Sequence, residues 1–138
     1  MMGAVRVSIK LKNAVDEELV SRALLAPRLL REVEFTGLVD TGAVSLVIPQ
    51  DIVTQLGLRI LHQRVAEFVN GEQQTIGVTG AIIVECENRA TTDEALVVGN
   101  EVLIGQVILE KLDLVVDCKN QKLIPNPANP NYPVAMIK

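Results

Sequence analysis

The chain has 138 residues, 49 % of them apolar and 2 % aromatic, and a net charge of −4. This length suits one domain over 1–138, with a core large enough to need no disulfide. The basic residues are scattered on an acidic chain, so we expect no nucleic-acid partner and no membrane partner.

In the first third of the chain, the residue pattern predicts two strands. Residues 5–12 alternate apolar and polar side chains, which is typical of a strand with one wet face. We expect 14–27 to be a loop with at most one turn of helix, because Ala26-Pro27 stops any continuation. Residues 29–39 form a second strand that becomes apolar on both faces as it enters the core.

The middle of the chain predicts a turn, a short helix and a hairpin. The turn is 40–42, and 44–48 is again β-branched and apolar. A helix follows Pro49 and is capped by Gly57. From 59 to 87 the pattern indicates strands around Asn70-Gly71, which is the strongest two-residue hairpin signal in the chain.

The last third predicts short elements and an irregular tail. Residues 95–98 and 102–104 read as buried strands, and 107–112 as a short helix. A final hairpin joins 114–117 to 121–124. The Pro-rich tail, 125–138, cannot be regular structure, although Val134 to Ile137 could pair as an edge strand with a partner chain.

One stretch contains the candidate catalytic residue. Asp40 follows an apolar pair and precedes a glycine turn in the run Leu38-Val39-Asp40-Thr41-Gly42-Ala43. A carboxylate at such a break in a buried strand can be held by backbone N–H groups and partly shielded from water. A second apolar pair followed by glycine and a short helix occurs later, at Leu103-Ile104-Gly105.

The first run resembles the active-site loop of retroviral-type aspartic proteases. The later run, 103–109, is similar to the looser Leu-Ile-Gly-x-x-x-Leu pattern of bacterial and archaeal single-lobe members of that superfamily. Gln106 stands where the retroviral enzymes usually carry Arg. The resemblance implies an all-β fold, a closed barrel of the retropepsin type with one or two short helices and a single lobe.

The resemblance also implies a mechanism and a homodimer. Peptide hydrolysis by carboxylates needs two of them about one water apart, and this chain has one Asp-Thr-Gly. Asp40 of each subunit would therefore meet on a twofold axis. Thr41 would form hydrogen bonds across the dimer, and Gly42 and Ala43 would frame the loop. The second element, 103–105, would pack beneath it.

The predicted hairpin around Asn70-Gly71 occupies the sequence position at which this family has the flap that covers the substrate. The resemblance assigns that role to Phe68, Val69, Asn70 and Gly71, with a peptide or protein substrate bound as an added strand. A plain hairpin remains the alternative for this segment. The reaction would need water and no cofactor.

Two alternatives remain open for the whole protein. Asp40 can be an ordinary turn residue, since Asp is common in turns. The chain can also be a non-catalytic module that binds a peptide on the same fold without cutting it.

The N-terminus and the cysteines limit location and metal chemistry. Residues 1–12 contain three cations and lack the apolar run of a signal peptide. No stretch approaches the roughly 20 apolar residues of a spanning helix. Cys86, Cys118 and the single His62 are too few for a zinc site. We therefore expect a cytoplasmic protein with two buried free thiols and no metal.

Overall fold

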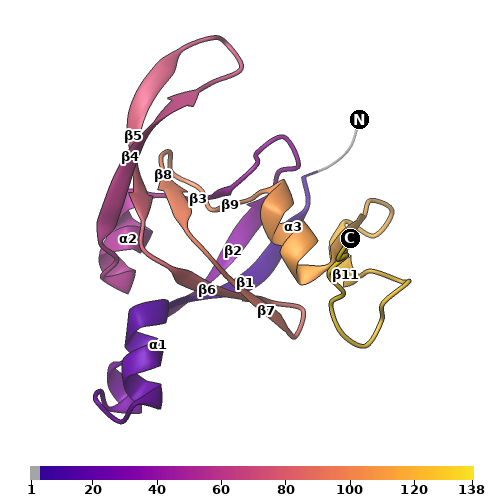
Figure 1. Ribbon diagram of the computed structural model, residues 1–138. Helices are drawn as coiled ribbons and strands as arrows, with labels where there is room; N and C mark the ends of the chain where they lie inside the picture. The colour runs from indigo at the N-terminus through magenta and orange to yellow at the C-terminus, as the bar shows by residue number, and fades with distance from the viewer. Residues whose placement is uncertain (1–3) are drawn as a thin grey trace.

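A computed structural model describes residues 4–138 (Figure 1). Strands make up 42 % of these described residues and helices 19 %, so the fold is mainly β. In chain order the elements are β1 (Arg6–Asn13), α1 (Ala14–Ser21), the 3-10 helix η1 (Pro27–Leu29), β2 (Glu32–Val39), β3 (Leu46–Ile48), α2 (Gln50–Leu56), β4 (Ile60–Glu67), β5 (Gln73–Thr79), β6 (Ile82–Cys86), β7 (Arg89–Asp93), β8 (Ala95–Val97), β9 (Leu103–Ile104), α3 (Gln106–Leu112), β10 (Leu114–Asp117) and β11 (Lys122–Pro125).

Nine strands form one sheet in the order β4-β5-β8-β3-β9-β2-β1-β6-β7, and β10 and β11 form a separate hairpin. The expected closed barrel is wrong, because β4 and β7 are the two edges of the sheet and do not pair. The physical reason lies in β4, which is exposed along nearly its whole length. A strand without a buried face gains little by closing the sheet against β7. Instead β4 and β5 leave the body together as a long hairpin (Figure 1).

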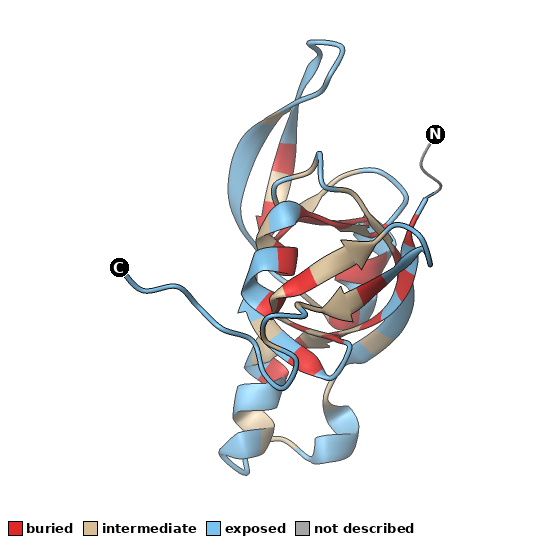
Figure 2. Cartoon of the chain, turned by 90° about the vertical axis from the view of Figure 1, so that its right-hand side faces the viewer, coloured by how far each residue is buried: buried red, intermediate tan, exposed pale blue. Residues whose placement is uncertain are grey.

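The core fills the space between the sheet and two short helices. Strand β1 alternates exposed and buried residues as its sequence predicts. Helices α2 and α3 each bury one apolar face against the sheet, and Figure 2 shows these buried positions lying inside the body. The largest fully buried side chains are Ile9, Leu11, Leu46, Ile48, Ile52, Leu56, Ile82, Ile104, Ile108, Leu112, Leu123 and Val78.

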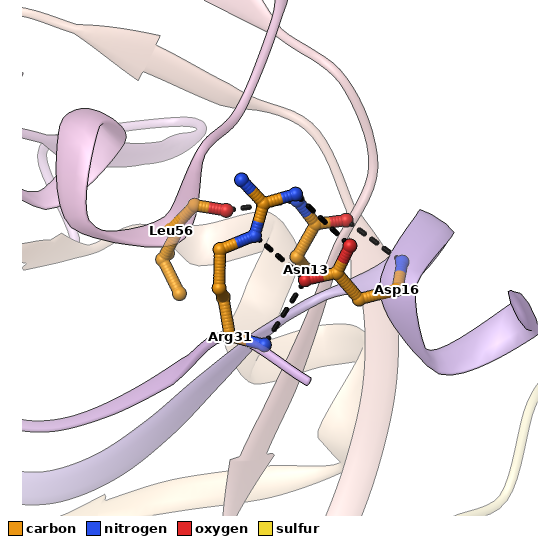
Figure 3. Close-up of polar contacts among 4 residues, drawn as sticks. All are labelled: Asn13, Asp16, Arg31 and Leu56. Atoms are coloured by element: carbon orange, nitrogen blue, oxygen red, sulfur yellow. Dashed lines mark hydrogen bonds and ion pairs between the residues drawn. The ribbon is translucent and has the colours of Figure 1, made fainter. Parts of the chain in front are cut away.

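The expected loop over 14–27 is wrong, since it contains the two-turn helix α1 and then η1. Asn13 caps α1, with its Oδ1 accepting from the Asp16 backbone N–H at 3.0 Å. The Asp16 carboxylate in turn accepts from the backbone N, Nε and Nη2 of Arg31 at 3.0, 2.8 and 3.0 Å (Figure 3). Asn13 Nδ2 donates to the Leu56 carbonyl at 2.8 Å. These contacts between distant segments hold a helix that local propensity leaves marginal. With α1, the described chain has three α-helices instead of the expected one or two.

The smaller differences between the predicted and the observed elements have local causes. The second strand begins at Glu32 instead of residue 29, because Pro27–Leu29 is a 3-10 turn. The stretch 73–85 divides at 80–81 into β5 and β6, which pair with different neighbours. Cys86 is buried as expected, whereas Cys118 is exposed in the turn before β11, so that part of the prediction is wrong. The final hairpin, β10 with β11, is confirmed.

The tail is attached to the body through Arg89 and through the Asp113 carboxylate, which accepts from Asn126 Nδ2 at 2.9 Å, Asn129 Nδ2 at 2.7 Å and the Val134 N–H at 3.1 Å. Arg89 is buried and donates to the carbonyls of Leu112 at 3.1 Å, Asp113 at 2.7 Å and Asn129. Beyond these contacts the chain runs away from the body (Figure 2), and no strand is assigned after β11. The pairing of 134–137 with a partner chain stays a prediction. Among the described residues, no helix is both long and apolar enough to cross a membrane.

Candidate active site

Asp40 begins a tight turn directly after β2. Its backbone N–H donates to the Ile104 carbonyl at 3.0 Å, and its carbonyl accepts from the Ala43 N–H at 3.1 Å. The Gly42 N–H donates to the carboxylate Oδ1 at 2.9 Å. The carboxylate is therefore held in a fixed direction at the end of a buried strand, while it remains partly open to solvent.

The second apolar-apolar-Gly element lies beside the first. Strand β9 pairs in parallel with β2, with Leu38 opposite Leu103 and Val39 opposite Ile104. Gly105 follows at a point of very close approach. A Cβ added there would lie 2.3 Å from the Ser45 carbonyl oxygen, a separation that real Cβ atoms do not show. Glycine at this position therefore allows the segment after Asp40 to pack against the start of α3.

Two backbone hydrogen bonds close this contact. The N–H groups of Gln106 and Val107, in the first turn of α3, donate to the carbonyls of Ala43 at 2.9 Å and Val44 at 3.0 Å. Neither N–H group has a carbonyl partner within α3, because the first four N–H groups of an α-helix have none. The turn that carries Asp40 is thus held by β9 on one side and by α3 on the other.

Asp40 opens onto a cleft of about 460 Å³. This volume lies in the range of pockets that bind organic ligands. Phe68 and Val69, in the loop of the β4–β5 hairpin, line the cleft together with Asp40. Apolar side chains from β3, β5, the segment around β8, and β9 complete the lining: Val47, Ile76, Leu96, Val98 and Leu103.

The cleft has an acidic character. Among its lining residues the charged side chains are Asp40 and Glu67, and both are carboxylates. Within the part of the chain that the structure describes, no group of three or more His, Cys, Asp and Glu residues is arranged to hold a metal ion. The chemistry that these residues offer is carboxylate acid–base chemistry in a mostly apolar setting.

The hairpin residues divide into two groups. Phe68 and Val69 line the cleft, whereas Asn70 and Gly71 form the turn beyond it. Gly71 adopts a φ of 86°, and Asn70 Oδ1 accepts from the Glu72 N–H at 2.9 Å. The loop is wider than a two-residue turn, since the Phe68 N–H donates to the Glu72 carbonyl at 2.9 Å.

Thr41 does not line this cleft. It is exposed on the other side of the turn, where it borders a separate hollow of about 350 Å³ between α3 and β10. Gln106, Glu110 and Val116 line the same hollow. The 40–42 turn therefore presents Asp40 to the cleft and Thr41 to a different surface.

Several lining residues were not singled out from the sequence. Val44 is 69 % exposed beside the catalytic turn, and Glu67 ends β4. Leu96 and Val98 stand two residues apart, so they share one face of β8 and its continuation. Because residues 95–98 are a continuous apolar run, the sequence did not show which of their two faces would line the cleft.

No protein-family model matches the sequence, and a search of curated proteins finds no match. The assignment of this site therefore rests on its residues and geometry.

Proposed function

We propose that this chain is an aspartic endopeptidase with a retropepsin-like fold, active as a homodimer. One observation carries the proposal: the carboxylate of Asp40 and the hairpin residues Phe68 and Val69 line the same cleft, although they lie far apart in the sequence. A fixed carboxylate facing a mostly apolar cleft, with a hairpin over it, is the arrangement that this reaction uses.

In the proposed mechanism, Asp40 of each subunit contributes one carboxylate to a shared site. Two carboxylates one water apart cannot both ionise, so they share a proton. The anionic member takes a proton from the bound water, and the protonated member donates a hydrogen bond to the scissile carbonyl. The water oxygen attacks the carbonyl carbon, and the amine leaves with the proton. The hydrogen bond from Gly42 to Asp40 Oδ1 keeps the carboxylate in position.

The dimer would form around the 40–42 turn itself, so that the two Asp40 carboxylates share one site and the two Thr41 hydroxyls lie beneath them at the interface. Thr41 lies on the side of the turn away from the hairpin residues, next to the hollow between α3 and β10. A hydroxyl at that place can donate to the equivalent loop of a second subunit. The exposed apolar tail offers further surface, since Met136 and Ile137 are 92 % and 87 % exposed.

The cleft also favours a class of substrate. Its apolar lining suits a peptide with apolar side chains next to the scissile bond. Glu67 near the hairpin loop favours a basic side chain further along the peptide. The hairpin would close over the peptide and bind its main chain as an added strand.

The direct test is cleavage of an unstructured peptide library by the purified protein at mildly acidic pH. We expect cleavage, inhibition by a statine-type compound, and a loss of roughly 10²–10⁴-fold or more in Asp40→Asn. The matched control is Asp51→Asn, which changes an exposed Asp on α2 outside the cleft and should leave the rate unchanged. Full activity in Asp40→Asn would refute the proposal.

The second candidate is a peptide-binding module without hydrolysis. It is favoured by the fact that one chain alone already lines a cleft of about 460 Å³. Dimerisation separates the two candidates, because a strict monomer cannot bring two Asp40 side chains together. A monomer that binds peptides in the cleft and releases them intact would support the module.

A further inference from the structure

Helix α1 lies at the opposite end of the molecule from the turn between β2 and β3 (Figure 1). A second groove lies beside this helix. The register of β1 on β2 pairs Arg6 with Leu38 beside the turn and Lys12 with Glu32 at the opposite end. Six residues of strand separate Leu38 from Glu32, which is about 20 Å. The groove at the Glu32 end shares no lining residue with the catalytic cleft.

The groove consists of two adjoining hollows of about 520 and 420 Å³ that share Val15 and Ala81. Leu58 and Leu61 line the first hollow, and Leu24 lines the second. The exposed fractions of Val15, Leu24 and Leu61 are 63 %, 71 % and 46 %. Apolar side chains this exposed and this close together are typical of an interaction surface.

The first hollow is bordered by two arginines although the whole chain is acidic, whereas the second hollow is bordered by both Arg22 and Glu18. Arg31 borders the first hollow, where Asp16 fixes its Nε and Nη2 while Nη1 lies over Gly57. Arg59 borders the same hollow and is exposed, and no ion pair involves it within residues 4–138. The second hollow is bordered by Arg22, whose Nε lies 3.4 Å from a Glu18 carboxylate oxygen.

We propose that this groove docks an extended segment of a partner protein in which apolar and acidic side chains alternate. Each of the two successive hollows can take one apolar side chain of the partner segment. The partner's carboxylates, placed between those apolar side chains, would reach Arg31 and Arg59. Charge complementarity disfavours the exposed apolar tail of a second copy, because that tail carries Lys138. An anionic membrane is disfavoured because it would also lie against α1, which exposes Glu17, whereas the carboxylates of a bound segment need to reach only Arg31 and Arg59.

The proposal is independent of the catalytic one and is tested on the full chain carrying Asp40→Asn, so that hydrolysis cannot consume the probe. The probe is a fluorescein-labelled peptide in which leucine and glutamate alternate, and binding is followed by anisotropy. We expect saturable binding that weakens as salt is added. We expect Arg59→Glu to weaken it by about tenfold.

The matched control is Arg28→Glu. It makes the same charge change in an exposed residue of η1 that does not line the groove, and we expect an affinity within about twofold of the parent. A second variant, Ala81→Leu, fills the junction of the two hollows without changing charge and should also weaken binding. Urea unfolding of each variant checks that the fold is retained.

Four results would overturn the proposal. The first is that the leucine–glutamate peptide does not bind, and the second is that a leucine–lysine peptide of the same length binds as tightly. The third is that Arg59→Glu binds the peptide as tightly as Arg28→Glu does. The fourth is that the parent binds anionic vesicles, or self-associates through Arg59, and does not bind the peptide, which would assign the groove to a membrane or to a second copy.

Discussion

Replacing Gly105 by Ala tests the packing that holds the turn carrying Asp40. Gly105 has φ −84° and ψ 178°, a conformation that alanine adopts without strain. The effect of the added methyl group is therefore steric. Its Cβ would lie 2.3 Å from the Ser45 carbonyl oxygen and 2.8 Å from the Ala43 carbonyl oxygen.

The size of the effect follows from this overlap. To reach 3.0 Å, the Ser45 carbonyl must move by at least about 0.7 Å, which is 3.0 minus 2.3. Overpacking of this kind costs about 1–3 kcal/mol. The same movement weakens the hydrogen bonds from Gln106 and Val107 to the turn, worth about 0.5–1.5 kcal/mol each. The same movement of the Ser45 carbonyl relieves the overlap and weakens the hydrogen bonds, so the two costs are not fully additive. We therefore expect a loss of about 2–4 kcal/mol in the free energy of unfolding.

Urea unfolding monitored by circular dichroism measures this loss as a midpoint about 1–2 M lower. The matched control is Gly80→Ala, where the nearest heavy atom to the added Cβ is Leu61 Cδ1 at 3.7 Å, an ordinary contact. That variant should equal or slightly exceed the parent in stability. Equal midpoints for Gly105→Ala and Gly80→Ala would refute the tight packing between α3 and the turn.

Three further predictions concern the rest of the fold. Hydrogen bonds from Arg31 lower the pKa of Asp16, so its stabilising effect is present above the ordinary carboxyl pKa and is lost as pH falls through the lowered one. Asp16→Asn should cost about 1–3 kcal/mol at pH 7 by urea unfolding, with the difference from the parent shrinking below about pH 4; a constant difference would contradict this. Arg89→Ala should cost about 2–4 kcal/mol and speed amide exchange in 126–134, because the carbonyls of Leu112 and Asn129 lose the guanidinium donor, whereas the Asp113 carbonyl retains the Asn126 N–H; unchanged exchange would contradict the anchor. Burial raises the pKa of the Cys86 thiol to about 11, so a thiol reagent at pH 8 should modify Cys118 in the folded chain and Cys86 only after unfolding, as mass spectrometry would resolve.

The expectation that the two apolar-apolar-Gly elements lie together came from the resemblance to the protease family, which the repeated pattern suggested. Leu38-Val39 and Leu103-Ile104 are short apolar pairs, and each is followed within a few residues by glycine. The structure aligns them residue for residue in parallel strands. The alternation along β1 was equally clear, since every second residue is apolar.

Other features depend on contacts that leave no local pattern. Helix α1 is held by Arg31, which is 15 positions from Asp16 and is not marked by any motif. Arg89 is surrounded by turn-like residues, and its acceptors are backbone carbonyls that any sequence would supply. The open sheet follows from β4, whose apolar residues Ile60, Leu61 and Val65 remain exposed. A sequence pattern does not specify which strand will be left at an edge.

Subunit mixing tests the central claim, that Asp40 from two chains forms one site. Wild-type protein is mixed with Asp40→Asn at constant total concentration, given time to exchange subunits, and assayed for peptide cleavage. If each site needs both carboxylates, the rate falls with the square of the wild-type fraction, to about a quarter in an equal mixture. A rate that falls only in proportion, to about half, would show that one Asp40 suffices and would contradict the account.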